Sequence, residues 1–298
     1  MTASPTSSTR SRIAGTRQGS PPSLLLTLLG DYWWGRHELL PSAALVELLA
    51  DFGVTDAAAR AALSRLVKQG LLASSKSGRN TFYGLTAKAS AVLDEGKSRI
   101  FEFGAGTQRW SGEWTLVAFS IPESSRSTRG SLRTRLRWLG FAPLYDGVWI
   151  SPYDRHEQAL GELRSLGITT ATAFRATVPD GGSDGGLPRT AWNLGEVTEL
   201  YEDFIVSTRA LRDQLGTGLL DDTSALVERT RLMDAWRAFP AVDPDIPEQL
   251  LPDGWPRPEA RELFLATYDS LGDPATARVR KVIAGHAPEI AAFASHHR

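Results

Sequence analysis

The sequence contains no cysteine, and this absence excludes disulfide scaffolds, zinc sites with thiolate ligands and cysteine nucleophiles. It also lacks a long apolar run. The densest run, Leu24 to Leu29, is interrupted by Thr27 and followed by Gly30, whereas a membrane span needs about 20 apolar residues. Of the 298 residues, 42% are hydrophobic and 22% are charged. We therefore expect a globular protein of roughly two or three domains, in a reducing compartment and outside the membrane.

The sequence also lacks the short motifs of known catalytic and metal sites. It has no Gly-x-Ser-x-Gly nucleophile motif and no phosphate-binding glycine loop followed by lysine. The histidines are scattered, without the His-Glu-x-x-His spacing of a zinc site, and we expect the chain to fray at His296 and His297. The sequence therefore predicts no catalytic residue, no metal site and no cofactor, and indicates that the protein is not an enzyme.

Acidic residues are scarce at the front of the chain. The net charge is +4 over residues 1–108, +2 over residues 109–180 and −7 over residues 181–298. This asymmetry predicts that a polyanion binds to the front part. Residues 1–19 are rich in Ser and Thr and contain arginines but no acid. We interpret them as a disordered tail, although an organellar transit peptide has a similar composition.

Helix start and stop signals divide residues 20–90 into three helices and a hairpin. Proline or a capping side chain marks the helix starts, and glycine marks the ends. These signals are Ser20-Pro21-Pro22, Pro41-Ser42, Gly53, Thr55 and Gly70. A short strand, a polar turn and an aromatic strand follow up to Leu85, as in a hairpin. This order is that of a winged helix-turn-helix, in which the third helix enters the DNA major groove beside the hairpin.

The third predicted helix has an apolar face and a basic face. Ala59, Leu63 and Leu66 follow at helical spacing and can face a core. Arginine and lysine on the other face can reach phosphates and base edges from within the groove. We predict DNA contacts from this face and from the hairpin through Arg60, Ser64, Arg65, Lys68, Lys76, Arg79 and Asn80. A small helical domain with an ordinary solvated face is the alternative interpretation.

The rest of the chain divides into further predicted segments. Residues 91–108 form a connecting helix or linker, and residues 109–178 show the order β-α-β-β-α-β, with an Asp-Gly turn between the middle strands. That order is the ferredoxin-like arrangement. A glycine-rich linker at residues 179–189 precedes a mostly helical C-terminal domain over residues 190–298. The predicted fold class is therefore α+β and multidomain.

Distinctive sequence strings occur in all three predicted domains. They are SLLLTLLGD at residues 23–31, RAALSRL at 60–66, GLL at 70–72, YGLT at 83–86, Trp114, GVWI at 147–150, DPDIP at 243–247 and LLPDGWP at 250–256. In this order and at these distances over residues 23–270, the chain resembles the PaaX-type repressors of phenylacetate catabolism. Three such groups of strings in order are fairly specific to the family.

The resemblance implies a cytoplasmic transcriptional repressor with a winged helix, a ferredoxin-like middle domain and a helical C-terminal domain. Such proteins act as homodimers on palindromic operators in double-stranded DNA. An aryl-CoA thioester, phenylacetyl-CoA in the best-known branch, releases them. The middle domain also resembles the small CRISPR-adaptation nucleases, which carry a metal-binding Asp at the end of the first strand. Ser120 occupies that place here, and a hydroxyl is a poor magnesium ligand, so we interpret the domain as a dimerisation and spacing module.

Two groups of arginines are candidates for binding an acyl-CoA effector. Arg231, Trp236, Arg237 and Trp255 combine guanidinium groups with aromatic rings and are the favoured effector-binding residues. The arginines between residues 126 and 137 are the second group, and they would equally suit a DNA backbone. Core packing of the two tryptophans, and a solvated helix face for the second group, are the alternatives.

Two other classes of function remain open at this stage. The first is a metabolic enzyme, a thioesterase or other CoA-dependent enzyme, with an appended DNA-binding domain. The second is a constitutive architectural protein without a ligand. A convergent acid–base pair in the last domain would favour the enzyme.

Overall fold

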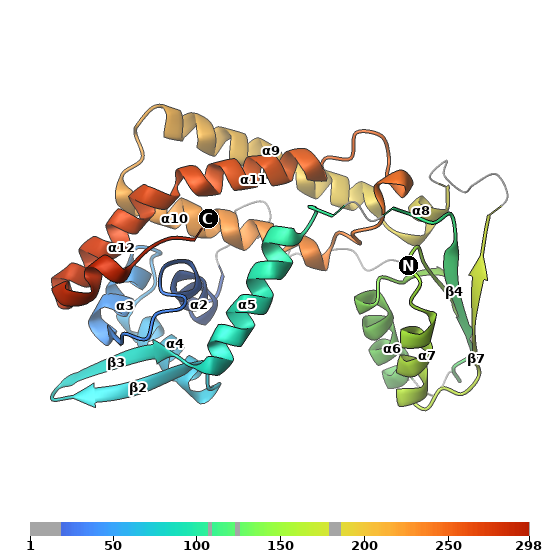
Figure 1. The fold of residues 1–298 in the computed structure, drawn as a ribbon, viewed down its shortest axis with the longest axis horizontal. Coiled ribbons are helices and arrows are strands. Elements are labelled where there is room, and N and C mark those ends of the chain that lie inside the picture. The colour runs from blue at the N-terminus through green and yellow to red at the C-terminus, as the bar shows by residue number, and fades with distance from the viewer. Residues whose placement is uncertain (1–18, 107–108, 123–125, 179–185, 298) are drawn as a thin grey trace. The chain divides into compact units, whose positions relative to one another are not determined.

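The chain forms two compact units of mixed helix and antiparallel sheet (Figure 1). The computed structural model describes residues 19–106, 109–122, 126–178 and 186–297. Within these ranges the larger unit contains residues 19–103, 200–239 and 257–297, and the smaller unit contains residues 104–199 and 240–256. The expected tail up to residue 18 and residues 179–185 of the expected linker lie outside the described residues. Within the described residues, no helix is both long and apolar enough to span a membrane.

The first part of the larger unit has the helices and the hairpin that the sequence predicts. Its elements are α2 (Pro21–Tyr32), β1 (Leu40–Pro41), α3 (Ser42–Ala50), α4 (Asp56–Lys68), β2 (Leu72–Ser77), β3 (Asn80–Leu85) and α5 (Ala87–Glu102). The three strands form an antiparallel sheet in the order β1-β3-β2. The β2–β3 hairpin extends away from the helices of its unit (Figure 1).

Local signals explain where these helices begin and end. Pro21 is at the first position of α2, where a missing N–H costs no helical hydrogen bond. The Thr55 side chain accepts a hydrogen bond from the Ala58 amide and caps α4. Gly53 has a φ of +73°, a conformation that favours glycine, and it permits the tight connection between α3 and α4.

The second part of the larger unit consists of helices from the C-terminal half of the chain. They are α9 (Leu194–Gly216, from residue 200 onward), α10 (Asp222–Trp236), α11 (Arg257–Ser270), α12 (Gly272–His286) and the 3-10 helix η4 (Pro288–Phe293); η2 (Phe239–Ala241) begins in this unit. Leu226, Val279 and Ile283 lie in one buried cluster with Leu25 and Leu49 of the first part. The helices of the predicted winged helix therefore share a hydrophobic core with the C-terminal helices.

Ion pairs reinforce this packing between α12 and α3. Arg278 donates two hydrogen bonds of 2.8 Å to the Asp51 carboxylate, and His286 lies 2.8 Å from Glu47. The planar guanidinium matches a carboxylate in this two-point geometry, which is stronger than a single contact. Arg278 is thus a direct polar link from the C-terminal helices to the helix that precedes α4.

The expectation that the chain frays at His296 and His297 is wrong. The His296 ring lies 3.0 Å from the Thr276 hydroxyl, and the His297 carbonyl accepts a hydrogen bond of 3.0 Å from Arg229. The Ser295 amide also donates to the Tyr32 carbonyl at 3.3 Å. No periodic pattern indicates this order, because side chains and carbonyls distant in the chain hold the segment.

The smaller unit is built around a four-stranded antiparallel sheet in the order β5-β6-β4-β7. Its elements are β4 (Trp114–Phe119), α6 (Arg126–Trp138), β5 (Ala142–Tyr145), β6 (Val148–Ser151), α7 (His156–Ser165), β7 (Ala171–Ala176), α8 (Gly186–Ala191), the first residues of α9 and the 3-10 helix η3 (Glu248–Leu250). The chain order β-α-β-β-α-β is that of a split βαβ motif.

The two faces of this sheet carry separate hydrophobic clusters, because neighbouring residues of a strand point to opposite faces. On one face Val117 packs with Leu136 of α6 and Leu163 of α7. On the other face Trp114 packs with Trp192 and with residues of the loop before residue 256. The sheet is therefore covered on both sides, by α6 and α7 on one and by α8 and this loop on the other.

Candidate nucleic-acid interface

Helix α4 is fixed to the larger unit through one face. Ala59, Ala62, Leu63 and Leu66 are buried. At its C-terminal end, the Lys88 ammonium donates a hydrogen bond of 2.8 Å to the Gln69 carbonyl. A cation at this end also interacts favourably with the helix dipole. The helix is thus held on a packed core rather than on a loop.

The opposite face of α4 is exposed and basic. All four residues predicted to contact DNA from this helix are exposed: Arg60, Ser64, Arg65 and Lys68. Arg60 forms a 3.2 Å ion pair with Asp56 one turn earlier, and both side chains are more than half exposed. Such surface pairs are worth only about 0–1 kcal/mol, so Arg60 can exchange this partner for a phosphate at little cost.

The hairpin next to α4 supplies further polar groups. Lys76, Arg79 and Asn80 lie at its tip and are exposed. Gly78 has a φ of +60°, which glycine adopts without strain and which closes the tight turn at the tip. The strand β2 packs beside α4. The structure therefore places all seven predicted DNA-contacting residues on the exposed sides of two neighbouring elements.

The predicted effector-binding residues are divided between the two compact units. Arg231, Trp236 and Arg237 lie on or next to α10 in the larger unit, whereas Trp255 belongs to the smaller unit, in the cluster around Trp114. Trp236 is 1% exposed and stacks on Phe264, with ring centroids 4.9 Å apart. In this conformation a ligand has no access to the Trp236 ring.

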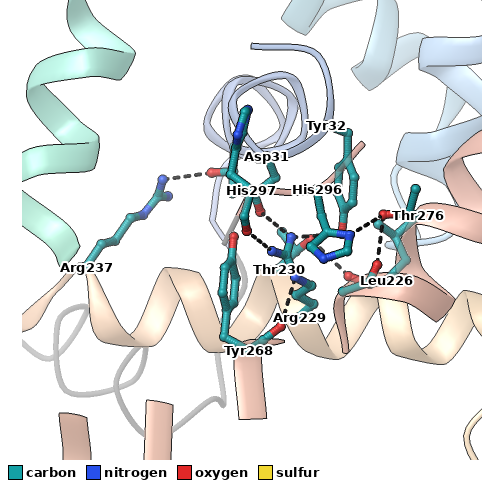
Figure 2. A network of polar contacts seen from close by, with 12 residues as sticks. Asp31, Tyr32, Leu226, Arg229, Thr230, Arg237, Tyr268, Thr276, His296 and His297 are labelled. Carbon is teal, nitrogen blue, oxygen red and sulfur yellow. Dashed lines mark hydrogen bonds and ion pairs between the residues drawn. The ribbon is translucent and has the colours of Figure 1, made fainter. Parts of the chain in front are cut away.

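The two arginines of this group are both engaged. Arg231 contacts Glu228 at 2.6 Å, one turn earlier on α10. Arg237 donates hydrogen bonds to the Thr27 hydroxyl at 2.8 Å and to the Ser23 hydroxyl at 2.7 Å, and it pairs with Asp234. Since Thr27 and Ser23 belong to α2, Arg237 joins the end of α10 to the first helix of the larger unit (Figure 2 shows this arginine beside the central network).

A buried polar network centred on Arg229 was missed by the sequence reasoning. Figure 2 shows Arg229 of α10 among Asp31 and Tyr32 of α2, Tyr268 of α11 and the C-terminal His297. Its guanidinium is 0% exposed and donates to the Tyr32 hydroxyl at 3.2 Å, the Tyr268 carbonyl at 3.1 Å and the His297 carbonyl at 3.0 Å. It also lies 3.5 Å from the Asp31 carboxylate.

The electrostatics of this network follow from its burial. Burial raises the pKa of the Asp31 carboxyl above its ordinary value of 3.8, and the positive charge of Arg229 opposes that rise. Burial alone would lower the pKa of Arg229, but the facing Tyr32 and Asp31 raise it, so the cation is retained. The Arg229 guanidinium also lies over the Tyr268 ring, 3.6 Å from its centroid.

One sequence signal could have revealed this residue. Arg229 lies three residues after Leu226 and four residues before Met233, so it falls on the apolar face of α10. A charged residue on such a face is either buried with partners or exposed at an edge. The partners, however, come from positions up to 197 residues away and have no local signature.

Ser120 and the Asp-Gly turn of the smaller unit are where the sequence places them. Ser120 is exposed directly after β4, and its amide donates to the Thr170 carbonyl at 3.1 Å. Asp146 is exposed in the turn between β5 and β6. Among the residues that the structure describes, no group of three or more His, Asp or Glu side chains could hold a metal ion.

Three family models match successive parts of the chain. Residues 20–89 match the "PaaX-like protein" model, residues 107–187 match "PaaX protein central Cas2-like domain", and residues 192–281 match "PaaX-like protein C-terminal domain". Together they span both compact units.

Two individual proteins are also similar to this chain over most of its length. The "Transcriptional repressor PaaX" of Escherichia coli (strain K12) is 30% identical over 267 residues, which cover 87% of this chain and 83% of that protein. The solved structure of "Uncharacterized protein Rv0674 from Mycobacterium tuberculosis" is similar with a TM-score of 0.57 and 22% identity, over 89% of this chain and 98% of that one. The latter likeness concerns the fold alone.

Proposed function

Because the chain belongs to the PaaX family of transcriptional repressors, we propose that it represses transcription by binding a specific sequence in double-stranded DNA with α4 and the β2–β3 hairpin. The observation that carries this proposal is the exposed basic face of α4, held on a packed core beside an exposed basic hairpin. The width of the B-DNA major groove accepts one such helix.

In this proposal the elements act as a winged helix. Ser64 and Arg65 reach base edges from the middle of α4, and Arg60 and Lys68 reach flanking phosphates. Lys76, Arg79 and Asn80 of the hairpin contact the adjacent backbone and contribute mainly salt-dependent affinity. Two copies of the chain bind the two halves of a palindromic operator, and the smaller unit serves as the dimerisation and spacing module.

The test is DNA binding by a pair of matched variants. A duplex is first selected from a random library with the wild-type protein. Arg65→Ala should weaken binding to this duplex, whereas Arg212→Ala, which removes the same charge from an exposed position of α9 in the same unit, should leave it unchanged. Failure of the wild-type protein to enrich any duplex, or an equal effect of both variants, would reject the proposal.

We further propose that an aryl-CoA thioester such as phenylacetyl-CoA releases the repressor, with Arg231 and Arg237 binding its phosphates. Arg237 holds Ser23 and Thr27 on α2, which packs against α4. A phosphate that takes Arg237 would remove these hydrogen bonds and loosen the support of α4. Contact with the buried Trp236 ring would require its aromatic cluster to open, and Trp255 in the smaller unit stays a separate candidate.

Thermodynamic linkage gives this second proposal a direct test. A ligand releases DNA only if it binds the DNA-free protein more tightly, and DNA must then weaken ligand binding by the same factor. Calorimetry of phenylacetyl-CoA with and without the selected duplex should show that factor, with free CoA and phenylacetate as weakly binding controls. Equal ligand affinity in both titrations would refute release of the DNA by the ligand. If the double variant Arg231→Gln, Arg237→Gln still binds phenylacetyl-CoA, the ligand site lies elsewhere.

The enzyme interpretation is not favoured, because the similar curated protein is a transcriptional repressor. The other alternative is a constitutive architectural protein that has no ligand. In that case no acyl-CoA should bind in the same calorimetry.

A further inference from the structure

Helix α5 lies between α4 and the C-terminal helices of the larger unit (Figure 1). It has 16 residues, which corresponds to a length of about 24 Å. Among these residues only Ala89 is buried. In its middle part, Leu93 lies against Gly30 of α2, and the Lys97 ammonium lies over the Trp34 ring just after α2. Because α5 buries so little of its own surface, its position depends mainly on what holds its two ends.

The N-terminal end of α5 is joined to the C-terminal end of α4. Lys88 donates a hydrogen bond of 2.8 Å to the Gln69 carbonyl, at the C-cap of α4. The Thr86 hydroxyl donates to the Gly70 carbonyl at 2.7 Å and accepts from the Ala89 amide at 3.2 Å. The residue that caps α5 therefore also holds the turn after α4, and the Lys88 cation lies at the negative end of the α4 dipole.

The C-terminal end of α5 is joined to α10 and α11 in a similar way. Arg261 of α11 donates to the Phe101 carbonyl at 3.0 Å and to the Phe103 carbonyl at 3.2 Å. The Trp236 indole of α10 donates to the Ile100 carbonyl at 3.1 Å. Carbonyls in the last turn of a helix have no partner within that helix. A cation from another helix thus again closes a helix C-terminus, as it does for α4.

We propose that α5 fixes the position of α4 relative to the C-terminal helices, with Arg261 and Lys88 as the positioning residues at its two ends. Arg261 then acts on the reading of DNA from a distance of about 20 Å, the length of helix between residues 88 and 101. This inference rests on the proposed function, because its readout is the binding of DNA by α4.

A second path between the same elements runs through α2, which packs against α4 and α10. A change in the middle of α5 separates the two paths. Ala91 is exposed there, so Ala91→Gly weakens the helix through its intrinsic propensity and leaves Leu93 and Lys97, which touch the α2 segment, in place. Gly96 allows the opposite change, because an added Cβ would meet open space and alanine favours the helix.

The first test is a double-mutant cycle on DNA affinity. The probe is the duplex selected by the wild-type protein. Arg261→Gln and Lys88→Met should each weaken its binding by about 2- to 30-fold. The double variant should lose less than the product of the two losses, because releasing one end of α5 already frees α4 from the other end. Losses that multiply would show two independent effects and would overturn the proposal.

Two further variants test the role of Arg261. Arg261→Lys keeps a cationic donor and should restore most of the affinity. Arg209→Gln removes the same charge from α9, where it pairs with Glu259 of α11, and should bind the duplex like the wild type. Equal losses for Arg209→Gln and Arg261→Gln would reject Arg261 as a positioning residue.

Lys88 is exposed, so a direct phosphate contact is the competing explanation for its effect. A lost phosphate contact lowers the salt slope of the binding constant by about 0.9. That explanation predicts the lower slope on the selected duplex and also on an unrelated duplex of equal length. The α5 proposal predicts that Lys88→Met keeps the wild-type slope on the unrelated duplex, and a lower slope there would argue against it.

The second test changes the helix between its two ends. Ala91→Gly should weaken binding to the selected duplex by up to about 5-fold, and the double variant Ala91→Gly, Gly96→Ala should return it towards the wild-type value. Ala210→Gly makes the same exchange at an exposed position of α9 and should leave the affinity unchanged. Circular dichroism checks that each variant is folded at the assay temperature. Wild-type affinity of Ala91→Gly would mean that α2 alone positions α4.

The outcomes also separate this inference from the proposed function. If the wild-type protein enriches a duplex but the losses of Arg261→Gln and Lys88→Met multiply, the role of α5 is rejected and the repressor assignment stands. If the wild-type protein enriches no duplex from the library, both are rejected.

Discussion

Arg229→Met should destabilise the larger unit more than any surface substitution. Methionine keeps most of the length and the apolar contacts of the side chain but removes the charge and all donors. The substitution leaves the Asp31 carboxylate buried without its cation and removes the hydrogen bonds to Tyr32, Tyr268 and His297. Breaking a buried ion pair by removing one partner costs about 3–5 kcal/mol. That is a large share of the roughly 5–15 kcal/mol that stabilises a typical domain.

Denaturant unfolding measured by circular dichroism gives this free energy. Asp31→Asn alone should also destabilise, because it leaves the Arg229 cation buried without a counter-charge. The double variant removes both charges and should lose less than the sum of the single losses, with a coupling of about 0.5–3 kcal/mol. A loss below about 1 kcal/mol for Arg229→Met, or strict additivity, would refute the network as a source of stability.

The pH dependence of the same comparison has a definite sign. In the wild type, burial raises the pKa of Asp31 above 3.8, so the folded state holds the proton to higher pH than the unfolded state. Asp31 therefore contributes stability that is present below pH 3.8 and lost as the pH rises through the folded-state pKa. Without Arg229 this pKa rises further. The destabilisation of Arg229→Met should thus shrink in acid, where Asp31 is protonated, and a constant or growing difference would contradict this assignment.

Three further substitutions test the fold at separate points. Gly147→Ala should lower the free energy of unfolding by about 1–3 kcal/mol and so lower the melting temperature, since φ is +76° and an added Cβ would lie 2.7 Å from the Phe119 carbonyl oxygen; an unchanged melting curve would contradict this turn geometry. Ile283→Ala should cost about 2–5 kcal/mol and speed hydrogen exchange in α3 as well as α12, because the core is shared; exchange confined to α12 would argue against that. Thr55→Ala should cost about 0.5–2 kcal/mol by removing the cap on Ala58, read as a lower denaturation midpoint, while Thr55→Ser should restore it.

The element boundaries were predictable because their causes are local. Pro21 and the Thr55 cap define helix starts within a few residues, and Gly53 and Gly70 define ends. The exposed face of α4 was predictable for the same reason, since a period of 3.6 residues places the i, i+4, i+8 series Arg60, Ser64 and Lys68 on another face than the buried Leu63 and Leu66. These signals need no knowledge of the rest of the chain.

The contacts that combine distant segments were not predictable. Nothing near Arg229 in the sequence indicates that Tyr32 and His297 lie beside it. Likewise, Trp236 and Trp255 are close in the sequence but belong to different compact units, because the chain leaves the larger unit after Phe239 and returns only at Arg257. Proximity along the chain therefore did not indicate the compact unit in which each ring packs, since tertiary contacts form between segments far apart in sequence.

Three arginines link the C-terminal helices to the helices that pack against α4. Arg237, Arg278 and Arg229 connect the C-terminal helices to α2 and α3, which in turn support α4. A change of conformation in the C-terminal helices would therefore act on α4 through packed side chains and ion pairs rather than through a flexible linker. Interfaces of this kind suit transmission of a ligand signal, provided that both ligands bias the same two states.

Whether α4 reads DNA sequence is tested most directly by the sequences that the wild type and Arg65→Ala select from a random library. The wild type should enrich a palindrome. Arg65→Ala should enrich the same palindrome with one position per half-site relaxed, because a lost base contact removes about 1–3 kcal/mol of discrimination at that position. Identical preferences at every position for the two proteins, or no enrichment by the wild type, would contradict the account.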